Sequence, residues 1–127
     1  MAVWFLRIAV LYLVFGVVWG IVMGSREAFA FTNVHARINL LGWATLALAG
    51  LIYWNAPKAG NNRLAIAHFW LQNLGLLIFV GGLYLIDASN GARGVPMTIA
   101  GSLVTLLALI VFAVNVWVNV KLLRAEL

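Results

Sequence analysis

Residues 64–86 read LAIAHFWLQNLGLLIFVGGLYLI and contain no Asp, Glu, Lys or Arg. At about 1.5 Å per residue, a helix of this length crosses the roughly 30 Å hydrocarbon core of a bilayer. Three further runs are long and apolar enough to do the same, at residues 8–24, 34–54 and 96–120. The sequence therefore predicts an all-α protein with four transmembrane helices.

The composition of the whole chain also favours lipid as its solvent. Of its 127 residues, 65% are hydrophobic and only 9% are charged, whereas soluble domains carry roughly 25% charged residues. The connections at 25–33, 55–63 and 87–95 are too short to form domains. We therefore expect one domain over residues 1–127, an integral membrane four-helix bundle with consecutive helices antiparallel. Pro96 is expected to begin the last helix, where its missing amide hydrogen costs nothing.

Basic residues are more frequent on one side of this predicted bundle than on the other. The side with both termini carries Arg7, Lys58, Arg63, Lys121 and Arg124, and the opposite side carries Arg26, Arg37 and Arg93. Because cytoplasmic loops are enriched in Lys and Arg, we expect both termini in the cytoplasm and the chain in a bacterial inner membrane. The cations are scattered singly, so no nucleic acid partner is expected.

Aromatic residues and glycines predict how the helices sit and pack. The cytoplasmic interface is expected to hold an aromatic belt made of Trp4, Tyr53, Trp54, Trp70 and Trp117. Gly16, Gly20 and Gly24 form two overlapping small-xxx-small steps, which let another helix backbone approach closely. Packing inside the four-helix unit is the expected role of these glycines, and a dimer interface is the alternative.

Several kinds of chemistry are excluded by residue type. The chain has no cysteine, which excludes disulfides, thiolate metal sites and thiol catalysis. Glu27, Asp87 and Glu126 all fall outside the predicted helices, so no acid inside the membrane is available for a proton relay. Two histidines without buried acids cannot form a three-ligand catalytic zinc site. We expect no catalytic residues and no independent enzymatic activity.

Two predicted helices each place one histidine and one amide on a common face. His35 and Asn39 are four residues apart, as are His68 and Gln72, and residues at this spacing share a helix face. Arg37 lies about 200° round the helix from His35. An imidazole is a good ligand for haem iron, and glycines further along each face would leave space for a macrocycle. The alternative is that each histidine bonds a backbone carbonyl or a lipid headgroup.

The expected depth of the two histidines limits how they can act together. His35 begins its helix on the outer side, whereas His68 begins its helix on the inner side, so the two should differ in depth by roughly 20 Å. They therefore cannot be opposite axial ligands of one haem in one chain. Asn115 and Asn119 on the last helix are expected to meet His68 and Gln72 across the bundle.

The two histidine segments resemble a known family. Residues 35–43, HARINLLGW, and 68–73, HFWLQN, are similar to motifs of small membrane proteins related to subunit I of haem-copper oxidases and nitric oxide reductases. The relatives read roughly His-x-His-x-Asn-Leu-Leu-Gly-Trp and His-Phe-Trp-Leu-His-Asn, and the resemblance covers about residues 32–82. Arg37 and Gln72 stand where the relatives have histidine.

The resemblance implies haem b binding, with His35 as the first-choice iron ligand and His68 as the second. Because the two cannot share one haem within one chain, His35 would take its second ligand from another chain, each histidine would have its own site, or one axial position would stay open. Arg37, Asn39 and Gln72 are the further candidate cofactor-binding residues, with Arg37 placed to pair with a propionate. The expected function is that of a membrane haem b protein of the oxidase subunit I type, in electron transfer or an accessory role. The alternative is a cofactor-free structural subunit, and in both cases we expect a homo-oligomer or a larger membrane complex.

Overall fold

The computed structural model describes residues 1–88 and 91–121, and every regular element within these ranges is helical. The prediction of an all-α protein is confirmed. Four long helical segments in these ranges are apolar and long enough to cross a membrane: Ala2–Ser25, Phe29–Asn55, Arg63–Asp87 and Gly91–Asn119. These segments are compatible with an integral membrane protein. The first, third and fourth are the single α-helices α1, α5 and α6.

The second long segment changes its winding along its length. It consists of the 3-10 helix η1 (Phe29–Phe31), the α-helix α2 (Thr32–Arg37), the π-helix η2 (Ile38–Ala44) and the α-helix α3 (Thr45–Asn55). A π-helix is wider than an α-helix and leaves backbone groups to be satisfied at its ends. The hydroxyl of Thr45 donates to the carbonyl of Leu40 at 2.8 Å. Gln72 on α5 donates to the carbonyl of Leu41 at 3.1 Å.

Two boundary predictions need correction. Pro96 lies inside α6, which begins at Gly91, and does not start the helix. A proline inside a helix removes one hydrogen bond to the carbonyl four residues earlier. For Pro96 this is the carbonyl of Ala92, an exposed residue in the first turn of α6. A short helix, α4 (Pro57–Gly60), was not predicted; it occupies the connection between α3 and α5, with proline at its first position.

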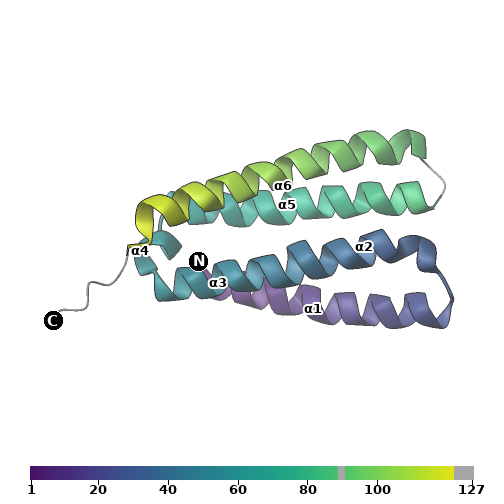
Figure 1. Ribbon diagram of the computed structural model, residues 1–127, viewed down its shortest axis with the longest axis horizontal. Helices are drawn as coiled ribbons and strands as arrows, with labels where there is room; N and C mark the ends of the chain where they lie inside the picture. The colour runs from purple at the N-terminus through teal and green to yellow at the C-terminus, as the bar shows by residue number, and fades with distance from the viewer. Residues whose placement is uncertain (89–90, 122–127) are drawn as a thin grey trace.

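The four long segments are arranged as two closely packed pairs (Figure 1), α5 with α6 and α1 with the second segment. Glycines bring α5 and α6 together at several levels. A Cβ atom added to Gly75 would lie 2.7 Å from the backbone nitrogen of Thr105, and one added to Gly101 would overlap the backbone of Phe79. Backbone contact of this kind is how helices associate where lipid removes the hydrophobic driving force.

The second pair also packs through glycines, but against side chains. Gly16 on α1 faces the amide of Asn39, and Gly20 faces the imidazole of His35. The prediction that these glycines serve internal packing is confirmed for both positions. A Cβ on Gly24 would meet nothing within 4 Å among the described residues. The third glycine therefore takes no part in this contact.

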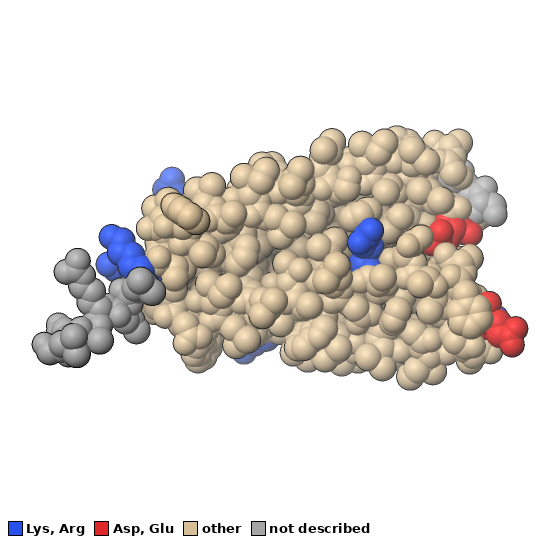
Figure 2. All heavy atoms as spheres, in the orientation of Figure 1, with Lys and Arg blue, Asp and Glu red and all other residues tan. Residues whose placement is uncertain are grey.

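A cluster of buried apolar and aromatic residues lies at the end of the molecule where α4 is found, and includes Phe5, Leu46, Tyr53, Ala59 and Phe69. The face in Figure 2 shows basic side chains gathered mainly at this end and acidic side chains at the opposite end. Large apolar side chains are exposed along α1, α5 and α6. Such a surface is typical of a protein surrounded by lipid.

Candidate functional site: two histidine clusters

The first cluster is built on the contact between α1 and α2. The ring of His35 fills the space above Gly20, with its Cε1 atom 2.8 Å from where a glycine Cβ would lie. One turn further on, the Asn39 amide fills the space above Gly16. The Asn39 Nδ2 group donates to the His35 carbonyl at 2.9 Å and lies 3.3 Å from His35 Nδ1. The shared face predicted from the four-residue spacing is therefore a polar strip that fits two glycines.

The Asn39 contact favours one tautomer of the His35 ring. An amide NH2 group only donates, so the Nδ1 atom beside Asn39 Nδ2 is the acceptor. In a neutral imidazole the hydrogen is then on Nε2. A haem ligand of the usual kind needs a free electron pair on Nε2 and a proton on Nδ1 that it gives to a neighbouring acceptor. A Cβ on Gly42, further along this face, would lie 2.6 Å from the Tyr12 ring, so Tyr12 occupies the space that this glycine was expected to leave for a macrocycle.

Arg37 points away from this cluster, as its angular position predicts. Its side chain is exposed, and the guanidinium carbon lies 5.7 Å from the ring centre of Phe79 on α5. This is a cation–π contact between the two helix pairs. Arg37 and His35 therefore face different helices, and a group bound at one does not contact the other.

The second cluster surrounds His68 on α5, whose side chain is fully buried. His68 Nδ1 lies 3.0 Å from the hydroxyl of Tyr53 on α3. The same hydroxyl accepts from Nδ2 of the buried Asn115 on α6 at 3.2 Å, and Asn115 Nδ2 also donates to the carbonyl of Ala59 at 2.9 Å. The cluster therefore joins three long helical segments and α4 by hydrogen bonds.

The remaining bonds of this cluster fall on the carbonyl oxygen of Asn115. Asn62 donates to it at 2.8 Å and Asn119 at 2.9 Å. The meeting of Asn115 with His68 that the sequence predicted is real, but it runs through Tyr53, and Asn119 is reached through Asn115. Gln72 takes no part in it, because its amide bonds Leu41 instead.

The predicted position of Tyr53 is wrong. It was expected in the interfacial aromatic belt, but only 1% of its surface is exposed, whereas its neighbour Trp54 is 60% exposed. The periodicity of the helix explains why Tyr53 is buried and Trp54 is not. Tyr53 lies seven residues after Leu46 and four after Ala49, so it shares a face with these two buried residues. Trp4, Trp70 and Trp117 are exposed, as a belt requires.

The faces of the His68 ring are covered by other rings. The ring centre of Phe112 lies 4.8 Å away in a stacked arrangement, and that of Phe5 lies 4.9 Å away. His68 Nε2 is buried and has no hydrogen-bond partner among the described residues, and the same is true of Gln72 Oε1. An unpartnered nitrogen is one property of an iron ligand. Phe5 and Phe112 nevertheless occupy the space against this ring, and the main hollows of the described chain are lined by other residues.

The two clusters lie far apart along α1. His35 packs on Gly20 and His68 packs on Phe5, fifteen residues earlier in the same helix. At about 1.5 Å per residue this separates them by about 22 Å, which agrees with the depth difference predicted from the sequence. One haem in one chain cannot have both as ligands. No group of three or more His, Cys, Asp or Glu residues able to hold a metal is found in the part of the chain that the structure describes.

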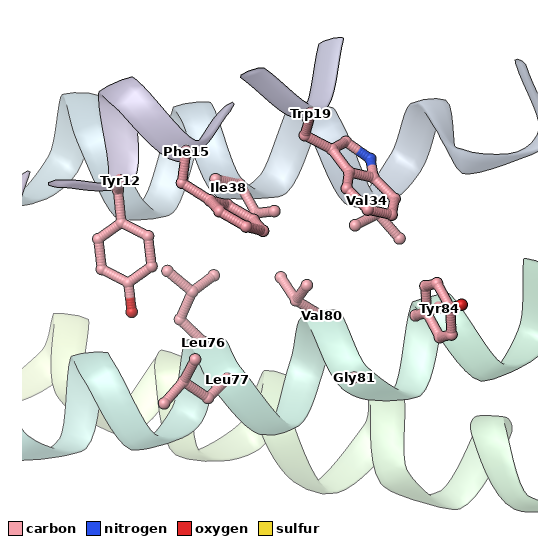
Figure 3. Close-up of a pocket in the computed structure, with 10 residues that line it drawn as sticks. All are labelled: Tyr12, Phe15, Trp19, Val34, Ile38, Leu76, Leu77, Val80, Gly81 and Tyr84. Atoms are coloured by element: carbon pink, nitrogen blue, oxygen red, sulfur yellow. The ribbon is translucent and has the colours of Figure 1, made fainter. Parts of the chain in front are cut away.

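A lateral hollow of about 470 Å³ lies between the two helix pairs, as Figure 3 shows. Its walls are aromatic and branched side chains of α1, the second long segment and α5, among them Tyr12, Trp19, Ile38, Leu76 and Tyr84. The Tyr12 side chain reaches from α1 toward α5 (Figure 3). A hollow with such walls suits an apolar chain.

Comparison with known proteins gives no further guide. No family model matches the chain, and no solved structure matches it.

Proposed function

We propose that this chain is an integral membrane protein with a structural or accessory role, a cofactor-free subunit of a larger membrane complex or of a homo-oligomer. The observation that supports it best is the use of both histidines in packing. The His35 ring packs directly against Gly20 of α1, and its Nδ1 atom faces the Asn39 amide. The His68 ring is bonded to the Tyr53 hydroxyl and packs against Phe5 and Phe112. Each imidazole acts as a contact between helices.

We further propose that consecutive long helices are antiparallel and that the N-terminus and the C-terminus of the chain both lie in the cytoplasm. Late residues of α5 face early residues of α6, since Gly82 meets Thr98 while Gly75 meets Thr105. The amino group of Met1 lies 3.5 Å from the side-chain oxygen of Asn61, beside α4. Basic side chains gather at that end (Figure 2), and the positive-inside rule assigns such an end to the cytoplasm. We propose a bacterial inner membrane as the location, as expected from the sequence.

The second candidate is a haem b protein acting in electron transfer, as the resemblance implies. The observation in its favour is the unpartnered Nε2 of His68. Bound haem would supply a one-electron redox centre, and His68 would be the residue to hold it. The covered ring faces of His68 weigh against this candidate.

One preparation tests both candidates. The full chain is expressed with added haem precursor, extracted in a mild detergent and measured by absorption spectroscopy, by a pyridine haemochrome assay and on native gels. The accessory role predicts no haem band and a complex larger than the monomer. Stoichiometric haem that is lost in His68→Ala and kept in His35→Ala would replace this proposal by the haem b function. A haem-free monomer would contradict both.

A further inference from the structure

Two buried polar atoms on one face of α5 lack partners in the described chain. They are Nε2 of His68 and Oε1 of Gln72, and both side chains have no exposed surface. Buried polar groups are nearly always hydrogen-bonded to protein or to ordered water. His68 and Gln72 lie one helical turn apart on the same face, so their two unpartnered atoms need an explanation that one shared partner can supply.

The hydrogen bonds around them assign one atom as a donor and the other as an acceptor. The Tyr53 oxygen accepts from Asn115, so the phenol hydrogen is available for His68 Nδ1, 3.0 Å away. In a neutral imidazole this leaves a proton on Nε2, which is then a donor. The Gln72 NH2 group donates to the Leu41 carbonyl, so the free atom is the carbonyl oxygen, an acceptor.

The position of the two side chains suits one shared partner. Residues four apart on a helix project from the same face, with Cβ atoms about 5–6 Å apart, so a small molecule held between the two side chains can serve both. A water molecule accepts from Nε2–H and donates to Oε1. A cation does not suit the site, because a protonated Nε2 repels it.

We propose that one internal water molecule binds between His68 and Gln72. The water completes a chain of hydrogen bonds from Asn115 on α6 through Tyr53 on α3 and His68 on α5 to Gln72 and the Leu41 carbonyl of the π-helix η2. This chain links both helix pairs at a level where the neighbouring contacts are apolar. Phe5 and Phe112 cover the imidazole and keep the site closed to lipid. The inference does not depend on the accessory role.

Nuclear magnetic resonance of the full chain with 15N-labelled histidine, in lipid nanodiscs, tests the proposal without any substitution. We expect His68 to be protonated at Nε2 and not at Nδ1, with a magnetisation-transfer peak between Nε2–H and a long-lived water. His35 serves as the internal comparison, since its Nε2 is also protonated but does not share this site. An unprotonated Nε2 would overturn the proposal, and so would an Nε2–H signal without a water peak or with direct coupling to Gln72.

A pair of variants adds a second measurement. Gln72→Met removes the acceptor and keeps a similar volume, so the water peak at His68 should fall at least several-fold. Asn73→Leu is the matched control, because Asn73 is half-buried on the next position and bonds only the Phe69 carbonyl of its own helix. An unchanged water peak in Gln72→Met would also overturn the assignment. Should Gln72→Met fail to fold, the wild-type spectrum decides alone.

Discussion

Replacing Asn115 by Leu removes a buried amide that takes part in four side-chain hydrogen bonds. It donates to Tyr53 and Ala59 and accepts from Asn62 and Asn119. Hydrogen bonds between membrane helices contribute about 0.6 kcal/mol each on average, which gives about 2.4 kcal/mol for four. Buried groups left without a partner cost about 1–3 kcal/mol. We therefore expect Asn115→Leu to lower the free energy of unfolding by about 2–4 kcal/mol.

The measurement is unfolding in mixed micelles by an increasing fraction of denaturing detergent, followed by tryptophan fluorescence. Two substitutions calibrate it. Asn119→Leu removes one bond of a half-buried side chain and should lower the free energy of unfolding by about 0.6 kcal/mol. Val114→Leu changes a side chain that is 48% exposed and should have almost no effect. An Asn115→Leu protein within about 0.5 kcal/mol of the wild type would refute the view that this amide organises the cluster.

Three further results are expected. Gly101→Ala should destabilise the protein by at least about 2 kcal/mol in the same assay, because its Cβ would overlap the backbone of Phe79; Gly24→Ala, where a Cβ meets no described atom within 4 Å, should be neutral or stabilising. Gly20→Ala should displace the His35 ring, visible as a shift of the His35 resonances, and an unshifted spectrum would contradict the packing described. A C-terminal fusion should be fluorescent with green fluorescent protein and inactive with alkaline phosphatase, and the reverse pattern would invert the proposed topology.

The four long segments could be predicted from the sequence because length and hydropathy suffice to identify them. The π-helix η2 could not be predicted from the sequence. Apart from Asn39, residues 38–44 are apolar and carry no sequence signal for a change of winding. The groups that complete the π-helix include a side chain from another element, Gln72 on α5. A single helical period contains no information about such a partner. The early start of α6 was missed for a related reason, since the effect of Pro96 depends on whether the carbonyl of Ala92 is exposed.

The candidate site was predictable in part for similar reasons. The four-residue spacing of His35 and Asn39 correctly gave a shared face, because that relation is local to one helix. What the face packs against depends on α1. The glycines expected to leave space for a cofactor are instead packed against neighbouring residues: Gly42 against Tyr12, Gly75 against Thr105 and Gly82 against Thr98. Tyr53 was missed because proximity to Trp54 suggested the interface, while the side-chain direction on the helix decided its burial.

The two positions where the resembling proteins carry histidine are both occupied here by residues that connect the helix pairs. Gln72 reaches from α5 to the Leu41 carbonyl of η2, to which its side-chain amide donates at 3.1 Å. Arg37 extends from α2 over the ring of Phe79 on α5. Each of these side chains therefore supplies a contact between the two helix pairs, so replacing either one is expected to loosen the packing of one pair on the other.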